Sequence, residues 1–161
     1  MSSTYKTFIR PKLEYASTVW DPHTCTNMKH QRDALEDAQT KGARFVTGQW
    51  KRRTSVTAMK RNLEWESLQE RRAKARLLMM HNIKQHAVAI PTHLLIVKTE
   101  PTMTTRGAVS KHHVPQPRIV ARERSFMCAT PIMWDGLPPG ITIEANHDNF
   151  RALLCSVVVI A

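Results

Sequence analysis

The stretch WESLQERRAKARLLMMHNIKQH, Trp65 to His86, decides how this chain folds. Its apolar residues recur at helical spacing and share one face, as a packed helix requires; they are Trp65, Leu68, Ala75, Met79 and Ile83. Arg72 and Arg76 fall in the middle of that face. A protein core does not accept an arginine whose guanidinium has no acceptor. We therefore expect a helix from about Trp65 to His86 in which these two arginines contact either carboxylates or phosphates.

Few carboxylates precede this helix and could accept from the two arginines. Glu14, Glu36 and Asp37 are the candidates, because they lie on helices that are expected earlier in the chain. We assign Arg72 to a structural contact of this kind and Arg76 to a phosphate of a bound ligand. Both assignments follow from the need of a buried guanidinium for acceptors.

Two helices are expected before the long one. The first starts at Pro11, since proline suits the first turn of a helix, and it ends at Asp21, since a residue before proline avoids the α region. The second runs from an N-cap at Asn27 to about Val46 and stops at Gly48. The expected apolar seams are Leu13, Ala16 and Trp20 on the first helix, and Leu35, Ala38, Gly42 and Phe45 on the second.

The pattern changes after the long helix. Four prolines between residues 87 and 124 exclude another long helix. The segment 90–97 is apolar and partly β-branched, which is typical of a short strand or extended segment, and 112–120 reads as an extended loop. Two short helices follow, one around Ile132 to Trp134 and one from about His147 to Cys155.

The expected fold class is therefore mainly α. Residues 1–86 form an N-terminal helical bundle, residues 87–124 an extended, proline-containing connector, and residues 125–161 a small C-terminal helical region. The part that follows the bundle is loop-rich, with short helices. A chain of 161 residues can bury one modest core or two small ones.

The chain is strongly basic, with a formal net charge of +11 and a pI of about 10.1. Residues 1–90 contain 17 Lys and Arg against 8 Asp and Glu, whereas residues 91–161 contain 7 against 5. The segment from Lys41 to Arg76 holds 11 basic and 3 acidic residues. Because each neutralised phosphate releases condensed counterions, such a segment favours a polyanionic partner.

A basic loop, GQWKRRTS, lies between the second helix and a short helix that Thr54 or Ser55 caps and that runs through Met59. Trp50 is interleaved with its cations, so the indole could stack on a base while the cations grip phosphates. The alternative is an ordinary solvated basic face. The candidate nucleic-acid-binding residues are Trp50, Lys51, Arg52, Arg53, Lys60, Arg61, Arg71, Arg72, Lys74 and Arg76.

No catalytic, metal or cofactor motif is found elsewhere in the sequence. The three cysteines are far apart and indicate reduced thiols, and no His or Cys group has zinc spacing. We expect the histidines, including His81, His86 and the pair at 112–113, to be exposed. No cofactor and no small-molecule substrate is expected. Three of the four tryptophans, Trp20, Trp65 and Trp134, fall in apolar segments and are expected to pack in the core.

The sequence does not suggest a membrane or secreted protein. No apolar run begins the chain. The apolar C-terminal stretch LLCSVVVIA spans nine residues, well short of the roughly 20 that a membrane helix needs. We expect an intracellular location, nuclear or cytoplasmic, and no membrane partner.

Five blocks of this sequence, in order, resemble the end of the reverse transcriptase of LINE-type, jockey-like non-LTR retrotransposons. Their sequences are RPKLEYASTVWDPHT from Arg10, LEDAQTKGARFV from Leu35, then TTRG, RSF and MWDGLPP. The similarity runs from about Tyr5 to Leu154. The resemblance implies that residues 1–86 correspond to the helical thumb and the rest to the C-terminal region that follows the palm.

The resemblance also implies a non-catalytic fragment of an RNA-directed DNA polymerase. In such an enzyme the palm holds two metal ions on paired aspartates, whereas no two aspartates are adjacent in this chain. The thumb would hold the RNA or DNA by phosphate contacts, and the palm of a full-length polypeptide would be a further partner. Two alternatives are a basic helical module that binds acidic protein, and a translated transposon relic without function.

The sequence departs from the family near its C-terminal end. Met127 and Cys128 stand where an aromatic residue and a proline are usual. Pro131 occupies an aliphatic helical position, and Ile132 and Met133 replace polar residues. The final SVVVIA has no counterpart, as expected of a truncated or decaying element copy.

Overall fold

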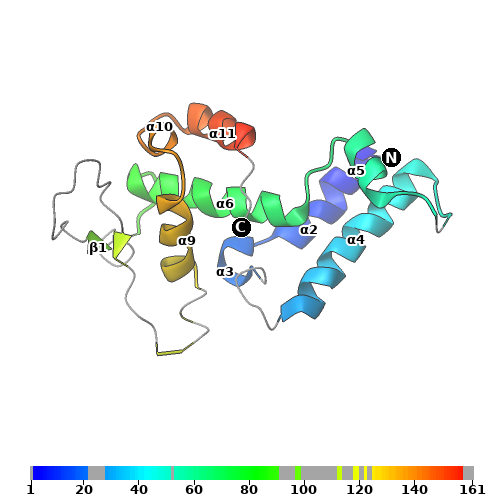
Figure 1. Ribbon diagram of the computed structural model, residues 1–161, viewed down its shortest axis with the longest axis horizontal. Helices are drawn as coiled ribbons and strands as arrows, with labels where there is room; N and C mark the ends of the chain where they lie inside the picture. Colours follow the sequence, from blue (N-terminus) through cyan, green and yellow to red (C-terminus); the bar gives the residue numbers. More distant parts are fainter. Residues whose placement is uncertain are drawn as a thin grey trace. The chain divides into compact units, whose positions relative to one another are not determined.

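The computed structural model (Figure 1) describes residues 2–21, 28–51, 53–90, 97–98, 112–113, 118–119, 122 and 125–157. These residues are mainly α-helical, so the predicted fold class is confirmed. The helices are α1 (Ser2–Thr4), the π-helix η1 (Tyr5–Ile9), α2 (Arg10–Glu14), α3 (Ser17–Trp20), α4 (Lys29–Thr47), α5 (Val56–Asn62), α6 (Leu68–Lys84), α9 (Phe126–Asp135), α10 (Pro139–Thr142) and α11 (His147–Ser156).

The chain divides into two compact units, Met1–Arg72 and Ala73–Ala161. The division falls inside α6, whereas the sequence analysis placed it after residue 86. The core of the second unit accounts for this difference. Leu77 and Met80 of α6 are fully buried in that core, so this half of the long helix belongs with the C-terminal helices.

The first helical segment begins earlier than expected, at Ser2, and is interrupted twice. A π-helical turn, η1, ends two residues before Pro11, which has no N–H to donate to the carbonyl four residues earlier in an α-helix. A second break follows α2, where Ala16 adopts the left-handed conformation with φ of 50°. The break changes the direction of the face beyond it, so Trp20 is exposed and the prediction that it packs in the core is wrong.

The second expected helix is α4, and Gly48 ends it in the left-handed conformation, as the sequence predicts. Met28 stands at its N-cap position, and Asn27 lies outside the described residues. The expected seam is displaced: Gln39 and Ala43 are buried, while Phe45 is exposed.

Contacts of α4 with the first helical segment explain this displacement. A methyl group at Gly42 would lie only 2.6 Å from Cε2 of Tyr5, so this glycine allows the close approach of η1 and α4. Tyr5 in turn stacks on Trp65, with ring centroids 4.2 Å apart. Ala43 completes this buried cluster, against which Val46 and Leu63 pack.

A capping box begins α6 at Leu68, three residues later than expected. The Ser67 hydroxyl accepts from the Glu70 N–H at 3.1 Å, and the Glu70 carboxylate accepts from the Ser67 N–H at 3.3 Å. Trp65 lies before the helix and is buried, as predicted. The side chains of α6 are buried on more than one face, which the single-face pattern of the sequence does not show.

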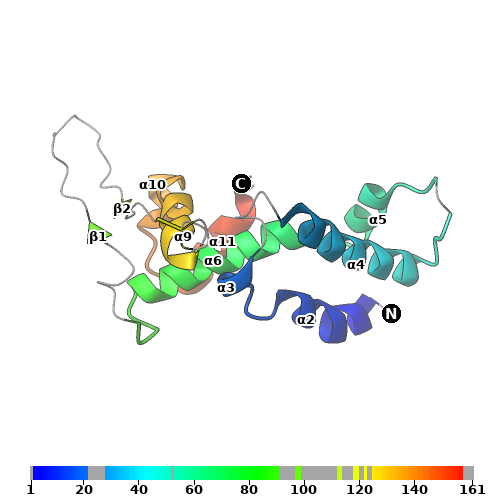
Figure 2. The same cartoon turned by 90° about the horizontal axis from the view of Figure 1, so that it is seen from below.

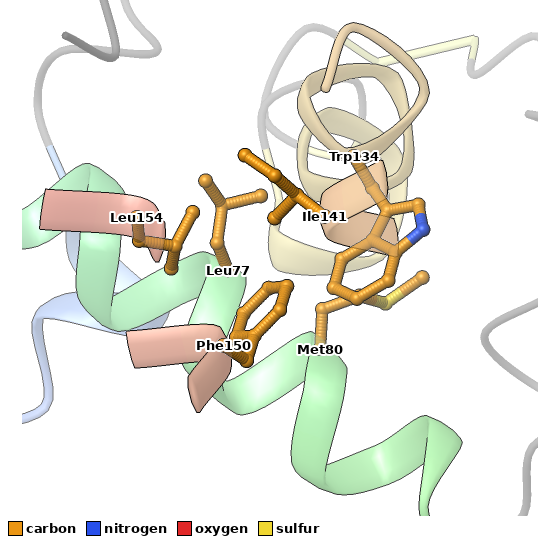
Figure 3. Packing of buried hydrophobic residues seen from close by; sticks show 6 residues of the cluster. All are labelled: Leu77, Met80, Trp134, Ile141, Phe150 and Leu154. Carbon is orange, nitrogen blue, oxygen red and sulfur yellow. The ribbon is translucent and has the colours of Figure 1, made fainter. Parts of the chain in front are cut away.

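The second unit is built around six buried residues that Figure 3 shows in close contact: Leu77, Met80, Trp134, Ile141, Phe150 and Leu154. They come from α6, α9, α10 and α11. The ring of Phe150 stacks on Trp134 at 5.3 Å between centroids. Burial of Trp134 agrees with the prediction, and α11 has nearly the expected bounds.

Other parts of this unit differ from expectation. His81 is buried, not exposed: its ring stacks on Phe150 at 4.3 Å, and its Nε2 lies 2.9 Å from the carbonyl oxygen of Glu144. The side chain of His112 is also largely covered, with an exposed fraction of 7%, and its Nδ1 lies 2.5 Å from Oδ1 of Asp135. The short strands β1 (Val97–Lys98) and β2 (His112–His113) pair antiparallel.

α9 is longer than the predicted segment and contains Pro131. Among the described residues, Cys128 and Cys155 are free thiols, and Cys25 lies outside them. In the part of the chain that the structure describes, no helix is long and apolar enough to cross a membrane.

Candidate nucleic-acid interface

The loop that carries Trp50 connects two well-defined helix ends. Gly48, with φ of +66°, closes α4 in a conformation that L side chains rarely adopt. Ser55 caps α5, because its hydroxyl accepts from the N–H of Ala58 at 3.3 Å, as the sequence predicts. The candidate residues of the loop therefore lie between two helix ends whose backbone conformation is defined, Gly48 and Ser55.

The two helices that flank the loop are fastened to each other, and Figure 2 shows α5 folded back beside α4. The Thr47 hydroxyl contacts the sulfur of the buried Met59 at 3.4 Å. Nearer the start of α4, Nζ of Lys60 lies 3.0 Å from Oε2 of Glu36. Two neighbouring residues in the middle of α5 thus contact α4 and hold α5 beside it.

The loop side chains themselves point into solvent. Trp50 is 62% exposed, and Lys51 and Arg53 are also exposed. The guanidinium of Arg44, on the last turn of α4, donates to the carbonyl oxygen of Lys51 at 3.2 Å and fixes the middle of the loop. Arg52 lies outside the described residues. The loop therefore exposes the indole of Trp50 together with the cationic side chains of Lys51 and Arg53, and the hydrogen bond from Arg44 restrains its backbone.

On α5 the two basic candidates differ. Arg61 is exposed, whereas Lys60 is partly buried and engaged by Glu36. An ion pair of this kind lowers the charge that Lys60 can offer to a phosphate. Within the described part of the chain, no ion pair engages Lys51, Arg53 or Arg61.

The candidate residues on α6 are not exposed beside the loop residues Trp50, Lys51 and Arg53. Arg72 is fully buried and Arg76 is 1% exposed, so their expected place on a phosphate-binding surface is wrong in this structure. Nε of Arg72 lies 3.2 Å from Oδ1 of the buried Asp21. The structural assignment of Arg72 is thus supported, but the acceptor differs from the three that the sequence suggested. The reason is the bend at Ala16, beyond which Asp21 follows α3.

Arg71 and Lys74 are partly buried. Arg71 makes two hydrogen bonds to the carboxylate of Glu14, and the one from its second terminal nitrogen is 3.0 Å long. This hydrogen bonding raises the pKa of the Arg71 guanidinium above its ordinary value. Arg71 therefore joins α6 to α2, and its charge is largely balanced within the first unit.

Two further exposed residues lie on α4, within ten residues of Trp50 in the sequence. They are Lys41 and Phe45, which sequence analysis assigned to no site and to an apolar seam, respectively. A signal for these two residues was available, because residues 38–63 contain seven Lys and Arg and no Asp or Glu. We call Lys41, Phe45, Trp50, Lys51, Arg53 and Arg61 the basic-aromatic surface.

No group of three His, Cys, Asp or Glu side chains suited to a metal ion lies among the described residues. Comparison of the chain with protein-family models, with curated proteins and with solved structures finds no match. The arrangement of side chains must therefore carry the functional argument. What the basic-aromatic surface offers chemically is positive charge and an aromatic face.

Proposed function

We propose that this chain binds the phosphate backbone of RNA or DNA through the basic-aromatic surface. The observation that carries the proposal is the exposed Trp50 beside the exposed Lys51 and Arg53, on a loop whose two ends are fixed. Cations of this kind attract phosphates without regard to base sequence, and a neighbouring indole can stack on a base.

The charge distribution supports the proposal. Three of the eight acidic residues in residues 1–72 are engaged by cations: Glu14 by Arg71, Asp21 by Arg72 and Glu36 by Lys60. No acidic residue interrupts residues 38–63. The basic residues of this stretch are therefore not interrupted by acidic ones along the chain, which favours counterion release on binding a polyanion.

We also propose that binding occurs without catalysis. Reverse transcription needs paired carboxylates that hold two metal ions. The only adjacent acidic residues in the sequence are Glu36 and Asp37. Glu36 already accepts from Lys60 and from the backbone N–H of Leu68, which is a structural use.

The resemblance to the post-palm part of non-LTR retrotransposon reverse transcriptases agrees with such a role. In a full-length polypeptide the first unit would then serve as a thumb that holds template and primer, and the palm would be its covalent partner. This placement rests on the sequence blocks from Arg10 to Pro139. The mainly helical first unit is compatible with it.

Salt dependence tests the proposed function. The full chain is titrated against a labelled RNA oligonucleotide at several salt concentrations. If about five phosphates are contacted, the logarithm of the association constant should fall with the logarithm of salt at a slope of about −4 to −5. An affinity that is independent of salt, or no binding, would contradict the proposal.

A further inference from the structure

Phe45 is exposed, although the apolar pattern of the sequence places it on the face of α4 that was expected to be buried. It is 59% exposed on the last turn of α4, five residues before Trp50, which is 62% exposed. Two large aromatic side chains in solvent cost hydration free energy, and neither belongs to the buried cluster that the described residues of the first unit form. Phe8 and Tyr15 are exposed as well, but only Phe45 and Trp50 stand in the stretch 38–63, which contains no acidic residue.

The immediate surroundings of both rings are basic. Lys41 lies one helical turn before Phe45, Arg44 is its neighbour, and Lys51 follows Trp50. No carboxylate belongs to this stretch of the chain. An apolar protein partner would not be matched by this charge, whereas a nucleic acid offers both phosphates and flat bases.

We infer that Phe45 and Trp50 are two base-stacking side chains, and that the preferred ligand of the basic-aromatic surface is a single-stranded segment of nucleic acid. This inference rests on the proposed function and deepens it. In a duplex the faces of the bases are covered by their neighbours, so exposed rings find no stacking partner there. In a single strand each unstacked base presents a π-face, and the neighbouring cations balance the phosphates.

The geometry of the segment supports a pair of stacking positions. Phe45 stands on a regular helix, and Gly48 turns the chain before Trp50. The hydrogen bond from Arg44 to the Lys51 carbonyl oxygen ties the loop beyond Trp50 back to the same turn of α4 that carries Phe45. The backbone of both residues is therefore attached to the C-terminal end of α4, which restricts the distance between the rings of Phe45 and Trp50.

Three fluorescent probes of equal length test the inference: oligothymidine, an abasic strand with the same phosphates, and a DNA duplex. The wild-type chain should bind oligothymidine more tightly than the abasic strand or the duplex. Phe45→Leu should weaken oligothymidine binding by about 5- to 20-fold and leave the abasic affinity unchanged, because only stacking is lost. Tyr15→Leu, a change at an exposed aromatic outside the basic segment, serves as the matched control.

A second readout addresses Trp50 directly. Oligothymidine should quench the tryptophan fluorescence of the wild-type chain, and Trp50→Phe should remove most of this quenching. Equal affinities for all three probes, or no effect of Phe45→Leu, would overturn the inference while leaving salt-dependent binding intact. If no probe binds in a salt-dependent manner, the proposed function itself fails.

Discussion

Arg72 and Asp21 form an ion pair in which both side chains are buried, with Nε 3.2 Å from Oδ1 and exposed fractions of 0% and 5%. The pair joins the first turns of α6 to the end of α3, 51 positions earlier in the chain. A buried charge of this kind is tolerated only with its partner in place. The contact therefore helps to specify how α3 and the first turns of α6 pack against each other.

Replacing Arg72 by Met should lower the free energy of unfolding by about 1–3 kcal/mol, because the buried carboxylate of Asp21 loses its guanidinium. Methionine keeps the length and the apolar stem of the side chain. Thermal or urea denaturation of the purified chain measures the change. Arg71→Met is the matched control, since its pair with Glu14 is partly exposed and should contribute about 1 kcal/mol or less. Equal losses in the two variants would contradict the assignment.

Burial raises the pKa of the Tyr5 phenol to about 12 from its ordinary value of 10. Since the folded state disfavours the phenolate, the stability is fully present below pH 10 and falls as pH rises to 12, by about 2–3 kcal/mol. Tyr5→Phe should abolish this part of the alkaline loss. Unfolding measured at pH 8 and pH 11.5 gives the difference, and the exposed Tyr15→Phe should behave like the wild type.

The same Tyr5→Phe substitution has a second expected result at neutral pH. The buried hydroxyl of Tyr5 has no hydrogen-bond partner among the described residues. Its removal should leave the free energy of unfolding unchanged or raise it by up to about 1 kcal/mol, because no bond is lost and a desolvated polar group is removed. A large destabilisation would show that the hydroxyl has an acceptor.

Charge removal on the loop should weaken nucleic-acid binding in a salt-dependent way. Changing Lys51 and Arg53 together to Gln should reduce the magnitude of the salt slope by about 2, because two phosphate contacts are lost. Lys12→Gln, an exposed lysine on α2, is the control and should alter the slope little. Fluorescence anisotropy with RNA measures both. An unchanged slope in the double variant would place the binding surface elsewhere.

We expect no polymerase activity from the purified chain, because the paired metal-binding aspartates are missing from its sequence. The assay combines primed RNA template, deoxynucleotides and magnesium or manganese. Primer extension above a no-protein control, if it persisted through a further purification step, would contradict this expectation. Binding of the same template by the same sample would show that the protein is folded and competent.

Local signals predicted the helices well where the chain itself determines them. Gly48, Ser55 and the start of α11 at His147 depend on a few neighbouring residues, and the structure confirms them. Phe45 and Trp20 were predicted wrongly, because periodicity defines a face without saying which neighbour covers it. In α4 the side that carries Gln39 and Ala43 turns inward instead.

The candidate site was predicted in part. Trp50, Lys51, Arg53 and Arg61 are exposed as a binding role requires, although binding itself is a proposal. The sequence alone does not distinguish the buried Arg72 and Arg76 from the exposed basic candidates, because their burial depends on residues that are distant in the sequence. His81 is a similar case: its place beside Phe150 arises from the meeting of α6 and α11, which no local pattern encodes.

Glu36 connects the loop to the rest of the first unit through a single carboxylate. One oxygen accepts from Lys60 of α5 at 3.0 Å, and the other accepts from the backbone N–H of Leu68, at the first residue of α6, at 3.1 Å. Loosening α5 would leave this carboxylate free to turn away from Leu68, so the two helices should gain and lose order together. A single strand of nucleic acid bound at the basic-aromatic surface would then slow hydrogen exchange at the Leu68 amide, although Leu68 is not part of that surface.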